Sequence, residues 1–124
     1  MQMQDKIVID DYIENDPLSE ENLDKTLETV NRFRLSFPNK TIWLYSGYTW
    51  NQVMNPVITD DFNPSRDELL RKRKEIVKQC DVMVDGRYID SQRNPSKKWA
   101  GSGNQRVIDT RKSLEQNRIV LHCK

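Results

Sequence analysis

The sequence predicts an α/β domain with a mainly parallel sheet and covering helices. Short apolar runs alternate with longer amphipathic segments in the order β-α-β-α-β. The run at 41–46 is apolar on both alternating faces, which is typical of a strand inside a helix-covered sheet. The length of 124 residues fits one domain, so we treat 1–124 as a single unit. Parallel neighbours then require right-handed crossovers.

The first half of the chain predicts a strand, a helix and a second strand. Lys6–Ile9 is a short edge strand, because acidic residues follow it at once. Asp16-Pro17 predicts the start of a helix, since Asp accepts hydrogen bonds from free amides and Pro suits the first helical position. Helical spacing then continues to Pro38-Asn39. Thr41–Ser46 is the central strand.

The second half predicts a helix, a buried strand and a β-rich tail. A loop rich in Asn and Pro runs from Gly47 to Pro64, and Ser65–Glu68 fits a capping box that opens the helix. Asp81–Asp85 is a short buried strand closed by a glycine. Beyond a polar loop, Arg118–His122 predicts a last strand.

Composition excludes several classes of protein. No apolar stretch approaches the roughly 18 residues of a membrane span. Cys80 and Cys123 form no disulfide framework, which favours a reducing cytosol, and their separation excludes a zinc or iron–sulfur site made by this chain alone. The net charge is +1, yet residues 1–62 carry five Lys/Arg against eleven Asp/Glu (−6), and 63–124 carry fifteen against eight (+7). The halves attract each other, or the basic half binds a phosphate-bearing partner, or, as we favour, the basic residues form the solvated face of a helix.

Candidate binding residues follow the predicted strands. In open parallel sheets, ligands bind beyond the carboxyl ends of the strands. Ser46-Gly47-Tyr48 and Asp85-Gly86-Arg87-Tyr88 stand at two such ends, where each glycine either lets backbone approach a ligand or merely ends the strand. Lys97–Arg106 combines small residues with positive charge, which suits an anion, although it matches neither a dinucleotide fingerprint nor a P-loop. We expect Trp43 and Tyr45 to pack in the core rather than to stack on bases.

Four blocks occur in one order: Asp16-Pro17-Leu18, Thr41–Thr49, Asp81–Arg87 and Gly101–Asp109. They resemble the later two-thirds of the anaerobic ribonucleoside-triphosphate reductase activating proteins, of the radical S-adenosylmethionine superfamily. The likeness covers 16–114 and leaves 1–15 as a divergent segment. It implies a partial α/β barrel in which a [4Fe–4S] cluster reduces S-adenosylmethionine, and the resulting radical abstracts hydrogen from a glycine of the reductase. It also implies a cofactor at the carboxyl ends of the strands.

The chain departs from that family at three places. No counterpart of the three-cysteine cluster motif is present, and Glu14-Asn15 stands where the family has paired glycines that approach the cofactor. Ala100 and Gly103 stand where the family has arginine and serine. We therefore expect a truncated or degenerate member that by itself has no catalytic residues for radical chemistry and holds no cluster. Glu14-Asn15 should also weaken binding of S-adenosylmethionine.

The remaining residues predict a remnant cofactor-side or partner-facing surface. Its members are Ser46, Gly47, Asp85, Gly86, Arg87, Asn104, Gln105 and Arg106. Ser46 and Asp85 should form hydrogen bonds, and Arg87 and Arg106 should hold a carboxylate, a phosphate or an acidic side chain. The implied partner is the reductase large subunit or a polypeptide that supplies the N-terminal half of the barrel. A non-catalytic nucleotide- or nucleic-acid-binding module, or an incomplete gene product, stays open as an alternative.

Overall fold

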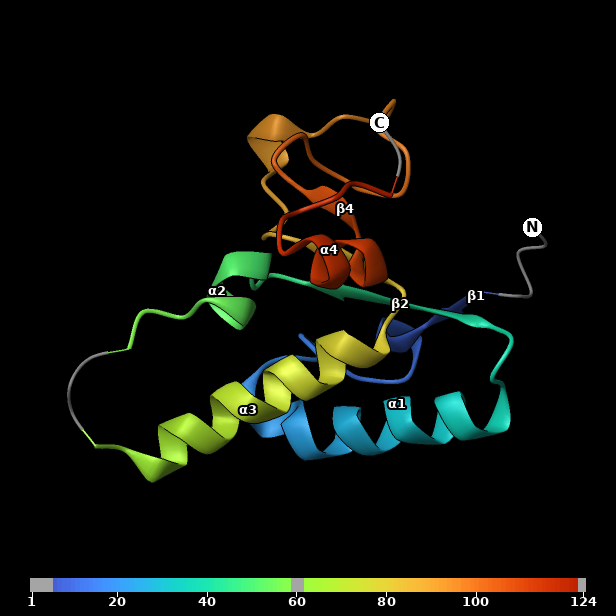
Figure 1. Ribbon diagram of the computed structural model, residues 1–124. Helices are drawn as coiled ribbons and strands as arrows, with labels where there is room; N and C mark the ends of the chain where they lie inside the picture. The colour runs from blue at the N-terminus through green and yellow to red at the C-terminus, as the bar shows by residue number, and fades with distance from the viewer. Residues whose placement is uncertain (1–5, 59–61, 123–124) are drawn as a thin grey trace.

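A four-stranded open sheet forms the centre of the computed structural model, which describes residues 6–58 and 62–122 (Figure 1). Its order is β1 (Lys6–Val8), β2 (Thr41–Ser46), β3 (Val82–Asp85) and β4 (Arg106–Asp109). The first three strands are parallel and β4 is antiparallel to β3. The predicted α/β class is confirmed, with β1 at an edge and β2 inside the sheet.

The main core lies between the sheet and two long helices, α1 (Leu23–Ser36) and α3 (Pro64–Gln79), which lie below the sheet in Figure 1. The short helices α2 (Trp50–Met54) and α4 (Thr110–Gln116) follow β2 and β4. Alternate strand residues point toward α1 and α3, because successive strand side chains face opposite sides of a sheet. The buried strand residues of this face are Ile7, Ile42, Leu44, Met83 and Ile108.

The opposite face of the sheet is covered by the loop that joins β3 to β4. Trp43, Val82, Val84 and Val107 form its buried cluster. The ring of Trp99, from the loop, lies 5.3 Å from that of Trp43. The expectation that Trp43 packs in the core is therefore confirmed. No helix in the described part of the chain is long and apolar enough to span a bilayer.

The predicted helix start at Asp16-Pro17 is wrong. A turn and a short 3₁₀ segment, Glu20–Asn22, precede α1, which begins only at Leu23. Asp16 does cap a backbone amide, since its Oδ1 accepts a hydrogen bond from the Leu18 N–H at 2.9 Å. The carboxylate also binds the end of β2, and this contact across the sheet holds the segment in a turn.

The predicted capping box at Ser65–Glu68 is also wrong. Asn63 caps α3 instead, because its side chain accepts a hydrogen bond from the Arg66 N–H and Pro64 occupies the first helical position. The loop predicted from Gly47 to Pro64 contains α2. Its signal was the pair Thr49 and Gln52, which form a reciprocal capping box.

The last predicted strand, Arg118–His122, is reduced to an isolated bridge between Leu121 and Ile108. Asn117 ends α4 in the left-handed conformation, with φ of 53°. The Ser113 hydroxyl then accepts a hydrogen bond from the Val120 N–H at 2.9 Å. These local bonds hold the segment against α4, so it pairs with β4 at few positions. Cys123 lies outside the described residues.

Candidate functional site

A cavity of about 600 Å³ lies where the parallel strands end at their carboxyl edge. Volumes of about 300–1,000 Å³ are usual for small-molecule sites. The lining residues come from the segments that follow β1, β2 and β3, and from the end of the loop before β4. They are Asp10, Asp16, Ser19, Tyr45, Ser46, Gly47, Tyr48, Gln52, Gly86, Arg87, Tyr88 and Gln105.

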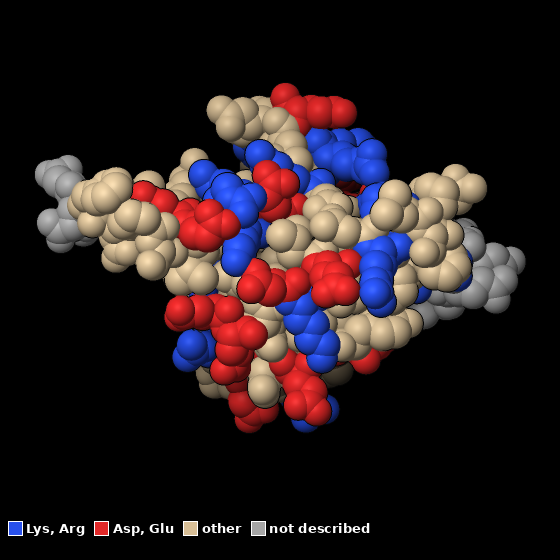
Figure 2. Space-filling view, turned by 90° about the horizontal axis from the view of Figure 1, so that it is seen from below, with Lys and Arg blue, Asp and Glu red and all other residues tan. Residues whose placement is uncertain are grey.

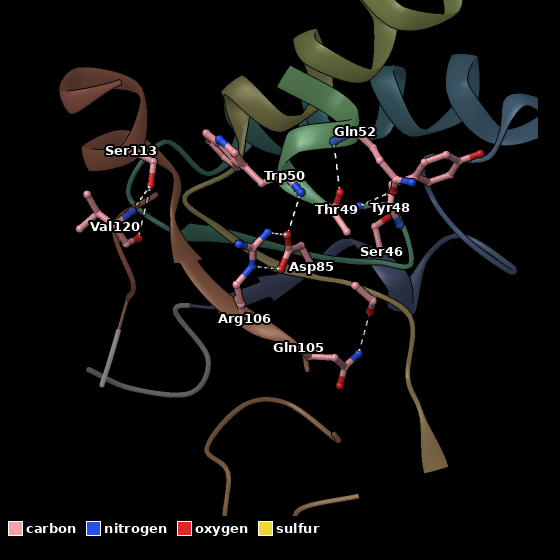
Figure 3. Close-up of polar contacts among 11 residues, drawn as sticks. Ser46, Tyr48, Thr49, Trp50, Gln52, Asp85, Gln105, Arg106, Ser113 and Val120 are labelled. Atoms are coloured by element: carbon pink, nitrogen blue, oxygen red, sulfur yellow. Dashed lines mark hydrogen bonds and ion pairs between the residues drawn. The ribbon is translucent and has the colours of Figure 1, made fainter. Parts of the chain in front are cut away.

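Asp16 joins the first of these segments to the end of β2. Its carboxylate accepts hydrogen bonds from the Ser46 hydroxyl at 2.8 Å and from the Gly47 N–H at 2.7 Å. The Ser46 hydroxyl in turn accepts from the Tyr48 N–H at 3.1 Å (Figure 3). Asn15, just before Asp16, has φ of 64°, a left-handed conformation that Asn tolerates better than most residues. Asn15, at a position where the resembled family has a glycine, thus has a backbone conformation typical of glycine.

Asp10 occupies the point where β1 leaves the sheet. Residues Ile9–Asp11 turn as a 3₁₀ segment, and the Asp10 carboxylate accepts the hydrogen bond of the Tyr45 N–H at 2.9 Å. The side chain therefore satisfies a strand amide that a continuing β1 carbonyl would have met. Burial raises the pKa of Asp10 to about 6. Burial, and then the charge of Asp10, raise the pKa of Tyr45 above its ordinary value.

Asp85 and Arg106 are paired with each other rather than with the cavity. They stand opposite one another on β3 and β4, and Asp85 is 1% exposed. Its carboxylate accepts from Arg106 Nε at 3.0 Å, from Arg106 Nη2 at 2.6 Å and from the Trp50 N–H at 2.7 Å (Figure 3). The hydrogen bond to Asp85 raises the pKa of the Arg106 guanidinium. This buried pair joins the sheet to the first turn of α2.

Asn104 and Gln105 fold the loop before β4. The Gln105 amide nitrogen donates to the Gly86 carbonyl at 3.1 Å, while its oxygen accepts from the Gly101 and Ser102 N–H groups. The Asn104 side chain donates to the Arg87 carbonyl at 2.8 Å. Gly86 has φ of 99°, so the turn after β3 needs a residue without Cβ.

The structure thus divides the eight predicted site residues. Ser46, Gly47, Gly86, Arg87 and Gln105 line the cavity, whereas Asp85, Asn104 and Arg106 stabilise its walls. Sequence reasoning missed the two carboxylates and several neutral polar groups. A signal existed for most of them, because they directly follow a strand end or belong to the strand and glycine blocks. Tyr48 and Tyr88, which belong to the two predicted segments after the strands, also line the cavity, and the missed lining residues are Asp10, Asp16, Ser19, Tyr45 and Gln52.

An open sheet with a cavity at the carboxyl ends of its parallel strands is the arrangement in which α/β domains usually bind ligands. Residues 15–108 match the family described as the 4Fe-4S single cluster domain, and the chain belongs to that family.

Curated relatives carry one description, anaerobic ribonucleoside-triphosphate reductase-activating protein. That of Vibrio cholerae is 33% identical over 90 residues, which are 73% of this chain and 48% of the relative. That of Escherichia coli is 33% identical over 92 residues, 74% of this chain and 49% of the relative. That of Enterobacteria phage T4 is 32% identical over 93 residues, 74% and 47% of the two chains. The chain therefore spans about half the length of these relatives. No solved structure matches it.

The described residues do not fit the iron–sulfur cluster that the family name implies. Such a cluster needs several convergent thiolates. Cys80 is buried, its Sγ lies 3.3 Å from the Ile76 carbonyl, and burial raises the pKa of its thiol. Within residues 6–58 and 62–122, no three His, Cys, Asp or Glu side chains are arranged to hold a metal ion.

Proposed function

We propose that this chain forms the cofactor-facing part of an activating protein for anaerobic ribonucleoside-triphosphate reductase. In this proposal its cavity binds S-adenosylmethionine, and the chain alone carries out no radical chemistry. The observation that carries the proposal is a cavity at the carboxyl ends of the parallel strands whose lining includes two acidic residues, Asp10 and Asp16, and a basic one, Arg87. Family membership and the curated relatives support the activating-protein part of the proposal, and S-adenosylmethionine is the ligand that the sequence resemblance implies.

The charges of the cavity match those of S-adenosylmethionine. The ligand has an ammonium, a sulfonium, a carboxylate and an adenine ring. Asp10 and Asp16 suit its cationic groups, and the exposed guanidinium of Arg87 suits the carboxylate. Two aromatic residues, Tyr48 and Tyr88, are among those that line the same cavity, and an aromatic residue suits the adenine. When bound beside a reduced cluster, S-adenosylmethionine supplies the radical chemistry of the family.

Glu14 and Asn15 do not obstruct this cavity. The Glu14 side chain is exposed and does not line the cavity, and Asn15 keeps the left-handed backbone. The bulk and charge of the Glu14 side chain, which we expected to weaken cofactor binding, therefore lie outside the cavity. A nucleotide fits less well, because the carboxylates of Asp10 and Asp16 repel phosphates at the cavity wall.

Calorimetric titration with S-adenosylmethionine tests the cavity. We expect saturable binding, and a rise in melting temperature equivalent to about 2.7 kcal/mol when the free ligand is a hundred times Kd. Arg87→Ala should weaken binding by about tenfold through the lost charge-assisted bond. Lys25→Ala, an exposed substitution on α1, is the matched control. Absence of binding at millimolar ligand, or tighter binding of ATP, would refute the assignment.

Anaerobic reconstitution with iron and sulfide tests the second part of the proposal. The purified chain should develop no stable charge-transfer absorbance of a cluster, because its described residues supply only a buried thiol. A stoichiometric cluster on the isolated chain would show that it holds the metal without a further polypeptide.

A further inference from the structure

The loop between β3 and β4, residues 87–105, has an excess of unpaired positive charge, and we call it the basic loop. It holds four Lys/Arg and one Asp, a net charge of +3. Arg87, Arg93 and Lys98 are exposed, and Lys97 is partly exposed. Among the described residues none of these four forms an ion pair, although the Lys97 ammonium donates to the Gly103 carbonyl at 3.0 Å.

The cations of α3 are arranged differently. Seen from the side of α1 and α3, positive and negative side chains are interspersed (Figure 2). Lys72 pairs with Asp24 of α1 at 2.5 Å, and Arg71 pairs with Glu68. Part of the positive charge of α3 is thus paired with carboxylates of α1 and of α3 itself. The basic loop covers the opposite face of the sheet, and its four cations form no ion pairs with other described residues.

The backbone of the basic loop is held in one arrangement. Arg93 and Ser102 form an antiparallel bridge, the Asn94 N–H donates to the Gly101 carbonyl at 3.2 Å, and the Gly103 N–H donates to the Gln92 carbonyl at 2.7 Å. Trp99 anchors the loop on the sheet, with the Lys6 ammonium 4.3 Å from its ring centre. A partner would therefore meet a surface that is already ordered, which reduces the entropy lost on binding.

An aromatic ring stands among these cations at the cavity. Tyr88 is 47% exposed and lines the cavity beside Arg87. Its ring lies flat against Gly101, where an added Cβ would come within 3.0 Å of two ring carbons. Tyr and Arg are enriched at protein–protein interfaces, where they dominate the binding energy. Their position joins the basic loop to the mouth of the cavity.

We propose that the basic loop docks an acidic segment of the polypeptide on which the activating protein acts, beside the cavity mouth. This inference rests on the proposed function and adds the chemistry of the partner. Four cations suit a short acidic peptide, whereas they can neutralise at most about four phosphates and so supply only a modest electrostatic affinity for nucleic acid. Asp10 and Asp16, across the cavity, would also repel a nucleic-acid backbone that continued past the loop.

Calorimetry with poly-L-glutamate tests the charge preference of the whole chain. The double variant Arg93→Glu/Lys98→Glu reverses two exposed charges that do not line the cavity. We expect it to weaken poly-L-glutamate binding by at least about tenfold through like-charge repulsion. Lys25→Glu makes one such charge reversal on α1, on the far side of the sheet, and should leave the affinity within about twofold of wild type. Circular dichroism confirms that each variant is folded.

The outcomes separate this inference from the proposed function. Binding of S-adenosylmethionine should be equal in wild type and double variant, because neither Arg93 nor Lys98 lines the cavity. If the wild-type chain does not bind S-adenosylmethionine, the proposed function is refuted. The comparison of poly-L-glutamate affinities still tests the docking inference. The docking inference is overturned if the double variant binds poly-L-glutamate like wild type, if Lys25→Glu loses as much, or if single-stranded DNA of equal charge binds more tightly than the peptide.

Discussion

Replacing Arg106 with Met removes the two N–H groups that donate to Asp85 but keeps most of the aliphatic bulk. The Asp85 carboxylate, 1% exposed, would then keep the single hydrogen bond from the Trp50 N–H among its present partners. An unpaired buried charge is costly, because neither water nor a cation then compensates its lost hydration. Arg106→Met should therefore destabilise the fold rather than only weaken a ligand.

The size of the effect follows from the burial of Asp85 and the partial exposure of Arg106. Breaking a buried ion pair by removing one partner costs about 3–5 kcal/mol. The Arg106 side chain is 37% exposed, so water can enter where the guanidinium was. We therefore expect a loss of about 2–4 kcal/mol from the free energy of unfolding. For a chain of this length that loss lowers the melting temperature by about 8–16 °C.

Thermal and urea unfolding followed by circular dichroism measure this loss. Arg87→Met is the matched control, since the Arg87 side chain is exposed and forms no ion pair with another described residue. Its stability should stay within about 0.5 kcal/mol of wild type. In the double variant Asp85→Ala/Arg106→Met the losses should be less than additive, because the two groups contact each other. An Arg106→Met variant that melts like wild type yet loses S-adenosylmethionine would refute the structural role.

Three further predictions concern single side chains. Because burial raises the pKa of Asp10 to about 6, above its unfolded value of about 3.9, the contribution of Asp10 to stability is fully present below about pH 4 and is lost as pH rises through about 6. Asp10→Asn keeps an acceptor for the Tyr45 N–H, so it should melt above wild type at about pH 7.5 and match it near pH 4; a lower melting temperature at the higher pH would contradict this. Gly86→Ala should cost about 1–2 kcal/mol in urea unfolding because φ is 99°, whereas Gly103→Ala, without that strain, should be near neutral. Iodoacetamide should leave the buried Cys80 unmodified in the native chain, and peptide mapping would reveal any labelling.

The sequence was sufficient to predict the first three strands in chain order and the carboxyl edge of the sheet at which the cavity lies. Alternation of apolar residues is a local property, so Thr41–Ser46 and the strand before Gly86 could be located without knowing any partner. Helix boundaries were less accessible. Asp16 resembles a helix cap in sequence, yet its carboxylate is engaged by the end of β2, thirty positions away. A local rule cannot include a competitor that arrives through folding.

The alternation of elements and the spacing of glycines thus determined the class of fold and the place of the cavity. The tertiary structure decided which polar groups face that cavity and which face each other. Arg106 and Asp85 are charged side chains of the kind that bind ligands. The antiparallel register of β3 and β4 instead places them opposite one another, and Asp85 is buried. The physical reason is that a buried charge takes the nearest opposite charge in space, and register and packing determine which residue that is.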